Sequence, residues 1–157
     1  MLSRHLFASL AATSMDQGRR AMCHALGAES AEGVCNWTPY LPYGVYTIPE
    51  ISMVGETEES LTSQGVPFEV GVASFSEVAR GQIIGDIYGM LKLIFHRETR
   101  RLLGVHIIGE RASEIIHTGQ AVLSYGGTID YFVNNVFNYP TLSDAYKVAA
   151  LNGINRL

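Results

Sequence analysis

The stretch "GMLKLIFHRETRRLLGVHIIG", residues 89–109, decides the fold. Two runs of alternating apolar residues flank the polar turn "RETR", and this pattern predicts an antiparallel β-hairpin. Lys92, His96 and His106 lie on one face of it, since side chains alternate along a strand. The opposite, apolar face is predicted to carry Leu91, Leu93 and Phe95 from the first strand and Leu103, Val105 and Ile107 from the second.

Further strands and helices are predicted on both sides of the hairpin. Before it, "GVYTIPEISMVG" (44–55) is extended with a break at Pro49, and "PFEVGVASF" (67–75) alternates as a strand. Between them "TEESLTSQG" predicts a short helix, capped by Thr57 and ended by Gly65. After the hairpin, "ASEIIHTGQAVLSY" (112–125) predicts a helix and "TIDYFVNNVF" (128–137) a shorter one. The apolar stripe of the longer helix is Ala112, Ile115, Ile116, Gly119, Val122 and Leu123.

The first forty residues have a different character. Residues 8–26 predict a helix that ends at Gly27, and its apolar face carries Ala11, Met15, Gly18, Met22 and Ala25. A connector rich in proline and glycine follows, so we expect a domain boundary near residue 40, between 1–40 and 41–157. The order of helix, paired strands and further helices predicts the α+β class, with an antiparallel sheet flanked by helices. Cys23 and Cys35 show no CxxC spacing, and we expect two free thiols, although a disulfide stays open as an alternative.

Composition limits the partners of the chain. Its 157 residues carry a net charge of −4 with 17% charged and 47% hydrophobic residues. No basic cluster extends beyond "HRETRR", so nucleic-acid binding is not expected. No apolar run approaches the roughly 20 residues that cross a bilayer. We therefore expect a cytoplasmic globular domain, and its few charges favour association with a partner.

Motifs of catalysis are missing. The chain contains no G-x-G-x-x-G or G-x-x-x-x-G-K-[ST] phosphate loop and no G-x-S-x-G nucleophile motif. Its five histidines never fall at metal-ligand spacing, and only His96 and His106 could meet across the hairpin. Paired strand histidines are more often surface residues than ligands, so no metal site is expected. By its residues alone, the chain has no complete active site.

The closing stretch "FNYPTLSDAYKVAALNGINRL" (137–157) predicts a corner and a last helix. Pro140 fixes the turn, Thr141 is placed as the N-cap, and Asp144 stands at the position of a capping-box acid. The predicted apolar face of this helix is Leu142, Ala145, Tyr146 and Ala149.

Several of these stretches occur together and in the same order in one known family. "YTIPEISMVGETEESLT", "VASFSEVARGQIIGD", "GMLKLIFHRETRRLLGVHIIGERASEIIHTGQAV" and the closing stretch resemble the C-terminal dimerisation domain of the pyridine nucleotide–disulfide oxidoreductases. Within that superfamily the likeness is greatest to the soluble NAD(P) transhydrogenases. The residues "ASLAATSMDQGRRA" resemble the helix that closes the FAD domain there. The resemblance implies an oxidoreductase flavoprotein of which this chain is a fragment, inactive by itself.

The resemblance also assigns site residues. Disulfide reductases of the family carry His-Pro-Thr-x-x-Glu in the tail, where the histidine serves as acid/base for the partner subunit's thiols. Tyr139 occupies that histidine position here and Asp144 the glutamate position, so no catalytic residue is expected. A phenol ionises only near pH 10 and is a poor proton shuttle at neutral pH. A transhydrogenase needs no thiol base, because its cofactors carry the hydride.

Two main-chain contacts to flavin are implied by position. The N–H of Ala11 matches the group that faces the flavin pyrimidine, and the carbonyl of Tyr139 matches the group that faces the flavin of the other subunit. FAD and NAD(P) are expected in the intact enzyme and no cofactor in this chain alone. A homodimer is expected through the C-terminal domain, and Tyr146, Val148 and Leu151 are expected to be exposed on the last helix.

Two alternatives stay open. The chain could belong to a dihydrolipoamide dehydrogenase-like disulfide reductase, although Tyr139 would deprive that chemistry of its base. It could also be a stand-alone assembly module that was never part of an enzyme.

Overall fold

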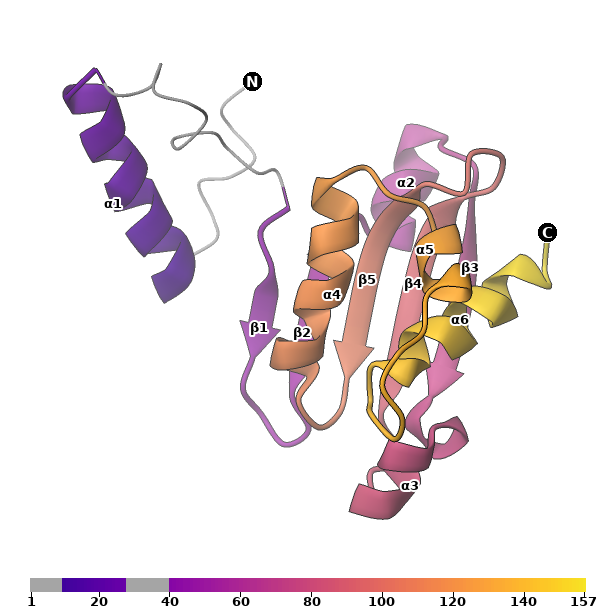
Figure 1. The fold of residues 1–157 in the computed structure, drawn as a ribbon. Helices are drawn as coiled ribbons and strands as arrows, with labels where there is room; N and C mark the ends of the chain where they lie inside the picture. The colour runs from indigo at the N-terminus through magenta and orange to yellow at the C-terminus, as the bar shows by residue number, and fades with distance from the viewer. Residues whose placement is uncertain (1–9, 28–39) are drawn as a thin grey trace.

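A computed structural model describes residues 10–27 and 40–157. Strands and helices follow in the order of an α+β domain, with one helix ahead of the sheet, as predicted (Figure 1). The elements are α1 (Ala11–Ala25), β1 (Tyr43–Val45), β2 (Ile51–Gly55), α2 (Glu58–Gln64), β3 (Phe68–Ser74), a 3₁₀ turn η2 (Phe75–Glu77), α3 (Ala79–Ile84), β4 (Met90–His96), β5 (Leu102–Ile108), α4 (Ala112–Ser124), α5 (Asp130–Asn134) and α6 (Asp144–Ile154).

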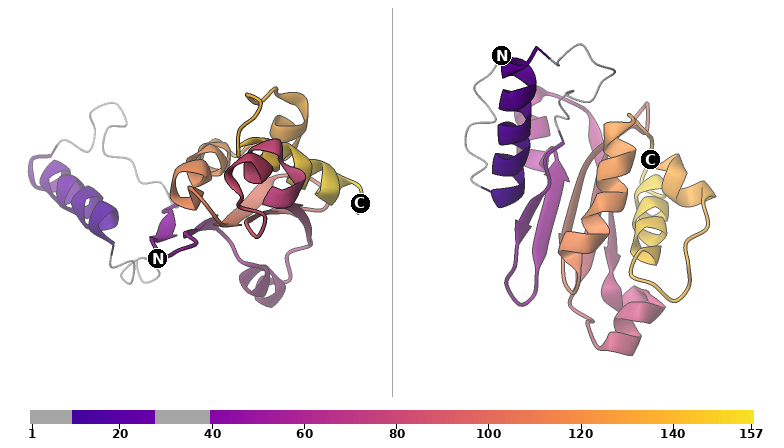
Figure 2. Two further views of the ribbon diagram at one scale, coloured as in Figure 1. Left: turned by 90° about the horizontal axis from the view of Figure 1, so that it is seen from below. Right: turned by 60° about the vertical axis from the view of Figure 1, so that its left-hand side comes forward.

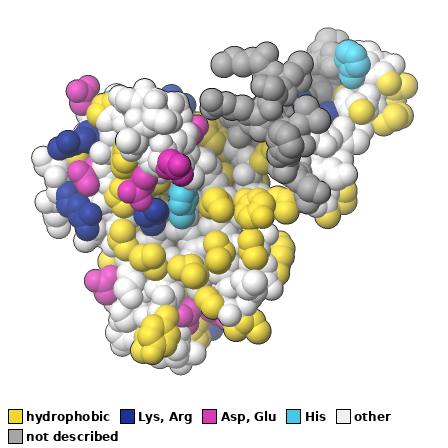
Figure 3. All heavy atoms as spheres, turned by 180° about the vertical axis from the view of Figure 1, so that it is seen from behind, with side chains coloured by type: hydrophobic (Ala, Val, Ile, Leu, Met, Phe, Trp, Pro, Cys, Tyr) yellow, Lys and Arg dark blue, Asp and Glu magenta, His cyan; other side chains and the backbone are white. Residues whose placement is uncertain are grey.

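The five strands form one antiparallel sheet in the order β1-β2-β5-β4-β3. Helices α4 and α6 cover one face of this sheet, and α2 lies against the opposite face (Figure 2). The hydrophobic core fills the space between the sheet and the α4–α6 layer. The rest of the opposite face carries apolar side chains at the surface (Figure 3), among them Tyr43, Ile51 and Met90.

The β4–β5 hairpin that decides the fold forms as predicted, with one correction. Leu91, Leu93 and Phe95 are fully buried. The expectation for the start of the second strand is wrong, because Leu102 is buried while Leu103 is only half-buried. A β-bulge shifts the register between Ile94 and Phe95, so that Leu102 becomes the partner of Phe95. A bulge places two residues opposite one, and it therefore moves the side-chain alternation by one position.

Strand β3 turns its smallest residues toward the core. Gly71 and Ala73 are buried beneath α6, whereas Val70 and Val72 on the other face are half-buried. A Cβ on Gly71 would lie 2.0 Å from the carbonyl oxygen of Ala149. Helix α6 therefore rests directly on the backbone of β3, and this contact requires glycine.

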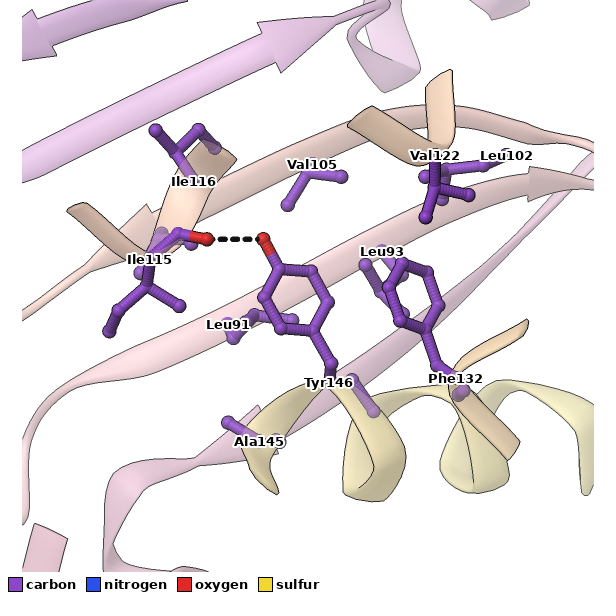
Figure 4. Close-up of a cluster of buried hydrophobic side chains, with 14 of the residues drawn as sticks. Leu91, Leu93, Leu102, Val105, Ile115, Ile116, Val122, Phe132, Ala145 and Tyr146 are labelled. Atoms are coloured by element: carbon purple, nitrogen blue, oxygen red, sulfur yellow. Dashed lines mark hydrogen bonds between the residues drawn. The ribbon is translucent and has the colours of Figure 1, made fainter. Parts of the chain in front are cut away.

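Helix α4 buries the predicted stripe in full, all six residues from Ala112 to Leu123. Its middle turn is tied to α6 by Tyr146, whose hydroxyl donates to the Ile115 carbonyl at 2.9 Å (Figure 4). The same hydroxyl accepts from the Gly119 N–H at 3.1 Å. The Tyr146 ring stacks on Phe132 of α5, with 4.8 Å between ring centroids. One phenol thus joins three helices in the centre of the core.

Helix α2 also forms as predicted. The Thr57 hydroxyl accepts a hydrogen bond from the Ser60 N–H at 3.1 Å, and Gly65 ends the helix in the left-handed conformation. The helix is tied to the sheet by an ion pair of 2.6 Å between Lys92 and Glu58.

The predicted apolar face of α1 is at the surface, since Met15 is 71% and Met22 58% exposed. The helix stands apart from α4 and α6 (Figure 1). The expectation of a free Cys23 thiol is wrong, because Cys23 is disulfide-bonded. Residues 8 and 9 of the predicted helix, Cys35 and most of the connector lie outside the described residues.

The start of the last helix differs from the prediction. Helix α6 begins at Asp144 after Ser143 as N-cap residue, and no side chain caps it. The Thr141 hydroxyl instead donates to the carbonyl of Asn138 at 2.7 Å. Thr141 is therefore not the N-cap, because its side chain closes the preceding corner and leaves a turn before the helix. The predicted apolar residues Leu142, Ala145, Tyr146 and Ala149 are nevertheless all buried.

Candidate functional site: the Tyr139–Pro140 corner and its groove

The corner between α5 and α6 presents Tyr139 to solvent. The Tyr139–Pro140 peptide bond is cis, and the Tyr139 side chain is 74% exposed. On either side the chain is anchored, because Phe137 packs against the core and Leu142 is buried within it. The corner is therefore an exposed turn between two anchored residues.

Tyr139 lies in the corner, and Asp144 lies at the start of the helix that follows it. Asp144 is the first residue of α6, where its negative charge interacts favourably with the positive end of the helix dipole. No hydrogen bond between the described residues joins its carboxylate to the Tyr139 phenol.

The two predicted flavin contacts are not brought together within one chain. Ala11 is the first residue of α1, so its N–H belongs to the first helical turn, which has no intrahelical acceptor. Helix α1 and the corner before α6 lie far apart in both views of Figure 2. The contacts predicted for Ala11 and Tyr139 therefore lie on separate parts of this chain.

A groove runs beside the corner, between α3, α4 and the chain before α6. One part encloses about 630 Å³ and an adjoining part about 360 Å³, and the two share Thr118, Thr141 and Ser143. The lining of the larger part is Arg80, Ile84, Asp86, Glu110, Arg111, Glu114, Ile115, Thr118, Pro140, Thr141, Leu142 and Ser143. Three segments that are distant in sequence form the lining, and two of them, 80–86 and 110–118, contribute charges of both signs.

Sequence reasoning missed this groove. Arg80 and Arg111 are 31 positions apart, in separate stretches of the sequence, and no site motif singled them out. The fold brings both to the groove, where Asp86, just after α3, binds the Glu110 N–H of the β5–α4 turn. The run "GERASE" (109–114) has a glycine followed by charged residues just before a helix. This was the one local indication of an ordered turn.

Glu50 fixes the N-terminus of α4 from the end of the β1–β2 hairpin. Its Oε2 accepts from the Ser113 hydroxyl at 2.7 Å and from the Ser113 N–H at 3.1 Å. These hydrogen bonds lower the pKa of Glu50 below its ordinary value. Because the pKa of Glu50 is lower in the folded chain, these bonds stabilise the fold at pH values above the pKa of Glu50 in the unfolded chain. The stabilisation is lost as the pH falls through the pKa of Glu50 in the folded chain.

The two histidines of the hairpin are hydrogen-bonded to backbone groups. His106 lies opposite Lys92 and not opposite His96, and its Nε2 lies 3.1 Å from the Glu56 carbonyl oxygen. Burial lowers the pKa of His106, which favours the neutral ring. His96 accepts at Nδ1 from the N–H groups of the following turn. Among the described residues no three acidic, histidine or cysteine side chains are placed to hold a metal ion.

The surface expected for pairing needs two corrections, at Tyr146 and at Val148. Leu151 is 43% exposed as expected, but Tyr146 is fully buried. The expectation for Tyr146 is wrong because its ring fills the centre of the core between α4, α5 and α6. Val148 is half-buried and packs against the core. Among the described helices, none is long and apolar enough to span a membrane.

With the fold and the groove described, comparison with known proteins gives the class of protein. Residues 41–150 match the family model for the pyridine nucleotide-disulphide oxidoreductase dimerisation domain. The match extends over more than half of the chain, and the chain therefore belongs to this family.

Particular relatives share much of its sequence. The soluble pyridine nucleotide transhydrogenase of Enterobacter sp. (strain 638) is 54% identical over 154 residues, which cover 96% of this chain and 32% of that protein. The one of Mycobacterium tuberculosis (strain ATCC 25177 / H37Ra) is 55% identical over 151 residues, covering 96% and 31%. The chain thus spans about a third of the length of these curated relatives.

Solved structures share the fold. LpdA from Mycobacterium tuberculosis is 28% identical with a TM-score of 0.79, covering 90% of this chain and 30% of that one. A Cu(II) complex of a variant of the HOCl-induced flavoprotein disulfide reductase RclA from Escherichia coli is 25% identical with a TM-score of 0.78, covering 89% and 31%.

Proposed function

We propose that this chain is the part of a soluble, flavin-dependent NAD(P) transhydrogenase that pairs two subunits, and that it acts in the cytoplasm as a homodimer. The observation that carries the proposal is the family match over residues 41–150 together with 54–55% identity to proteins named soluble pyridine nucleotide transhydrogenase. We propose residues 41–157 as the dimerisation domain and residues 1–40 as the end of an FAD domain.

The corner supports hydride transfer in preference to thiol chemistry. Reduction of a disulfide requires an acid/base group beside the sulfur atoms, and Tyr139 with Asp144 offers no such pair. Transfer of hydride between two nicotinamides through a flavin requires no protein acid/base at this place. The residues of the corner are therefore compatible with transhydrogenation.

The main-chain groups at Ala11 and Tyr139 fit a flavin. Both residues are exposed, and the first-turn N–H groups of α1 point out of the positive end of the helix dipole. In the intact dimer, Ala11 of one subunit would donate to the flavin ring, and the Tyr139 carbonyl of the other would accept from it. When bound, FAD supplies the hydride chemistry, while this chain orients the ring and closes one side of its site.

A disulfide reductase is the second candidate. The similar solved structures favour it, since RclA is a flavoprotein disulfide reductase. Tyr139 argues against a disulfide reductase, because it offers no acid/base group for the sulfur chemistry. A reductase from this family would need another proton donor beside the corner, and the histidine nearest in sequence, His117, lies on the exposed side of α4, hydrogen-bonded to Gln120.

The proposal predicts that the purified chain alone is colourless and transfers no hydride from NADPH to NAD. Ala11 and Tyr139 would give FAD only two main-chain contacts, and the chain has no phosphate-binding loop to hold the rest. The measurement is the visible absorbance of the purified chain after incubation with FAD and gel filtration. A near-stoichiometric yellow complex would contradict this account of the chain as a fragment of the flavin site.

A further inference from the structure

The α3–β4 loop is joined to the β5–α4 turn by a single carboxylate. Asp86 accepts from the Gly89 N–H at 2.9 Å through Oδ1 and from the Glu110 N–H at 2.7 Å through Oδ2. The first bond closes the loop of Asp86 itself, and the second crosses to a segment 24 residues later. Both carboxylate oxygens of Asp86 therefore accept hydrogen bonds from backbone N–H groups.

The β5–α4 turn has a conformation that needs such support. Gly109 has φ 136° and Arg111 has φ 59°, which is the left-handed region that residues other than glycine rarely adopt. A Cβ on Gly109 would lie 2.7 Å from the Phe75 ring and 2.8 Å from Asp86 Oδ2. From the other side the Glu50 carbonyl accepts from the Gly109 N–H at 2.9 Å. The turn is thus held between Asp86 and Glu50.

This turn forms one wall of the groove beside the corner. Glu110, Arg111 and Asp86 line the groove together with Pro140, Thr141, Leu142 and Ser143. Arg111 directly follows the residue whose N–H binds Asp86. The Asp86 contact therefore supports the backbone that carries Glu110 and Arg111 into the groove.

We propose that Asp86 is a positioning residue for the subunit interface. It fixes the β5–α4 turn and so holds Glu110 and Arg111 in place beside the corner groove. The second copy of the chain binds at this groove and contacts that arrangement. The inference rests on the proposed function, in which the corner faces the other subunit. Asp86 itself does not need to touch that subunit.

The test compares Asp86→Ala and the milder Asp86→Asn with Glu77→Ala. Glu77 is a matched control, because its carboxylate also accepts a backbone N–H, that of Ser74 at 2.8 Å, but it does not line the groove. Amide hydrogen exchange at Glu110 and Gly89 is measured together with the dimer dissociation constant and the midpoint of urea unfolding.

We expect Asp86→Ala to speed exchange at Glu110 and Gly89 about tenfold or more and to raise the dissociation constant at least tenfold, with exchange at Ile94 unchanged. Asp86→Asn keeps one acceptor oxygen and should lie between Asp86→Ala and the unsubstituted chain. Unchanged exchange at Glu110, or equal weakening of the dimer by Glu77→Ala, would overturn the proposal. If the unsubstituted chain were monomeric, the proposed dimer would fail, and the exchange at Glu110 would still decide whether Asp86 holds the turn.

Discussion

Gly71→Ala is expected to unfold the contact between β3 and α6 and to cost more than the roughly 1–3 kcal/mol of an ordinary overpacking substitution. The added Cβ would lie 2.0 Å from the Ala149 carbonyl oxygen and 2.9 Å from the Gly153 nitrogen. Both are backbone atoms of α6, so no change of rotamer relieves the overlap. Either the helix leaves the sheet or the strand bends away from it.

The measurement for Gly71→Ala is the free energy of unfolding in urea, followed by circular dichroism. Gly44→Ala is the matched control, because Gly44 is also a strand glycine and its added Cβ would lie no closer than 3.5 Å to the Tyr46 ring. We expect the control to stay within about 1 kcal/mol of the unsubstituted chain, since isolated strand substitutions span about that range. A Gly71→Ala chain as stable as the control would show that α6 is not packed on β3 as described.

Tyr146→Ala is expected to destabilise the fold by about 3–5 kcal/mol, the range for removal of a buried aromatic side chain. It removes the stacking on Phe132 and leaves a cavity where α4, α5 and α6 meet. Burial raises the pKa of the Tyr146 phenol, so the hydroxyl stays protonated and continues to donate to Ile115.

Tyr146→Phe separates the ring from the hydroxyl. Ile115 and Gly119 are four residues apart in α4, so the carbonyl and N–H that the hydroxyl bridges can bond to each other as in any α-helix. The loss should therefore stay near the roughly 1 kcal/mol of one hydrogen bond. Urea unfolding of both variants measures the difference, and equal losses for Phe and Ala would refute the role given to the ring.

The local parts of the fold were predictable because their signals lie within a few residues. The Thr57 cap, the Gly65 stop and the stripe of α4 each depend on spacing along one element. The bulge that buries Leu102 was not predictable, since it depends on how two strands pair. Neither was the burial of Tyr146, because the same spacing fits a core residue and an interface residue, and only Phe132 and α4 decide between them.

The site was predictable only where a continuous stretch marks it. The closing stretch drew attention to Tyr139 and the corner, and the structure places both at the surface. Thr141 was misassigned because a hydroxyl before a helix can cap it or close the turn in front of it, and here it binds Asn138. The opposite wall of the groove depends on Asp86 reaching Glu110, a contact that no local pattern predicts.

The central claim is that two copies of this chain pair, and sedimentation equilibrium at micromolar concentration tests it most directly. A standard interface buries on the order of 1,600 Å² in total, enough for stable pairing when its centre is apolar. Leu151→Asp serves as the comparison, because Leu151 is exposed on α6 and a charge there should weaken an apolar contact without disturbing the core. The account predicts a species of twice 17.2 kDa that Leu151→Asp shifts toward the monomer. A single 17.2 kDa species at high concentration, for the unsubstituted chain, would contradict it.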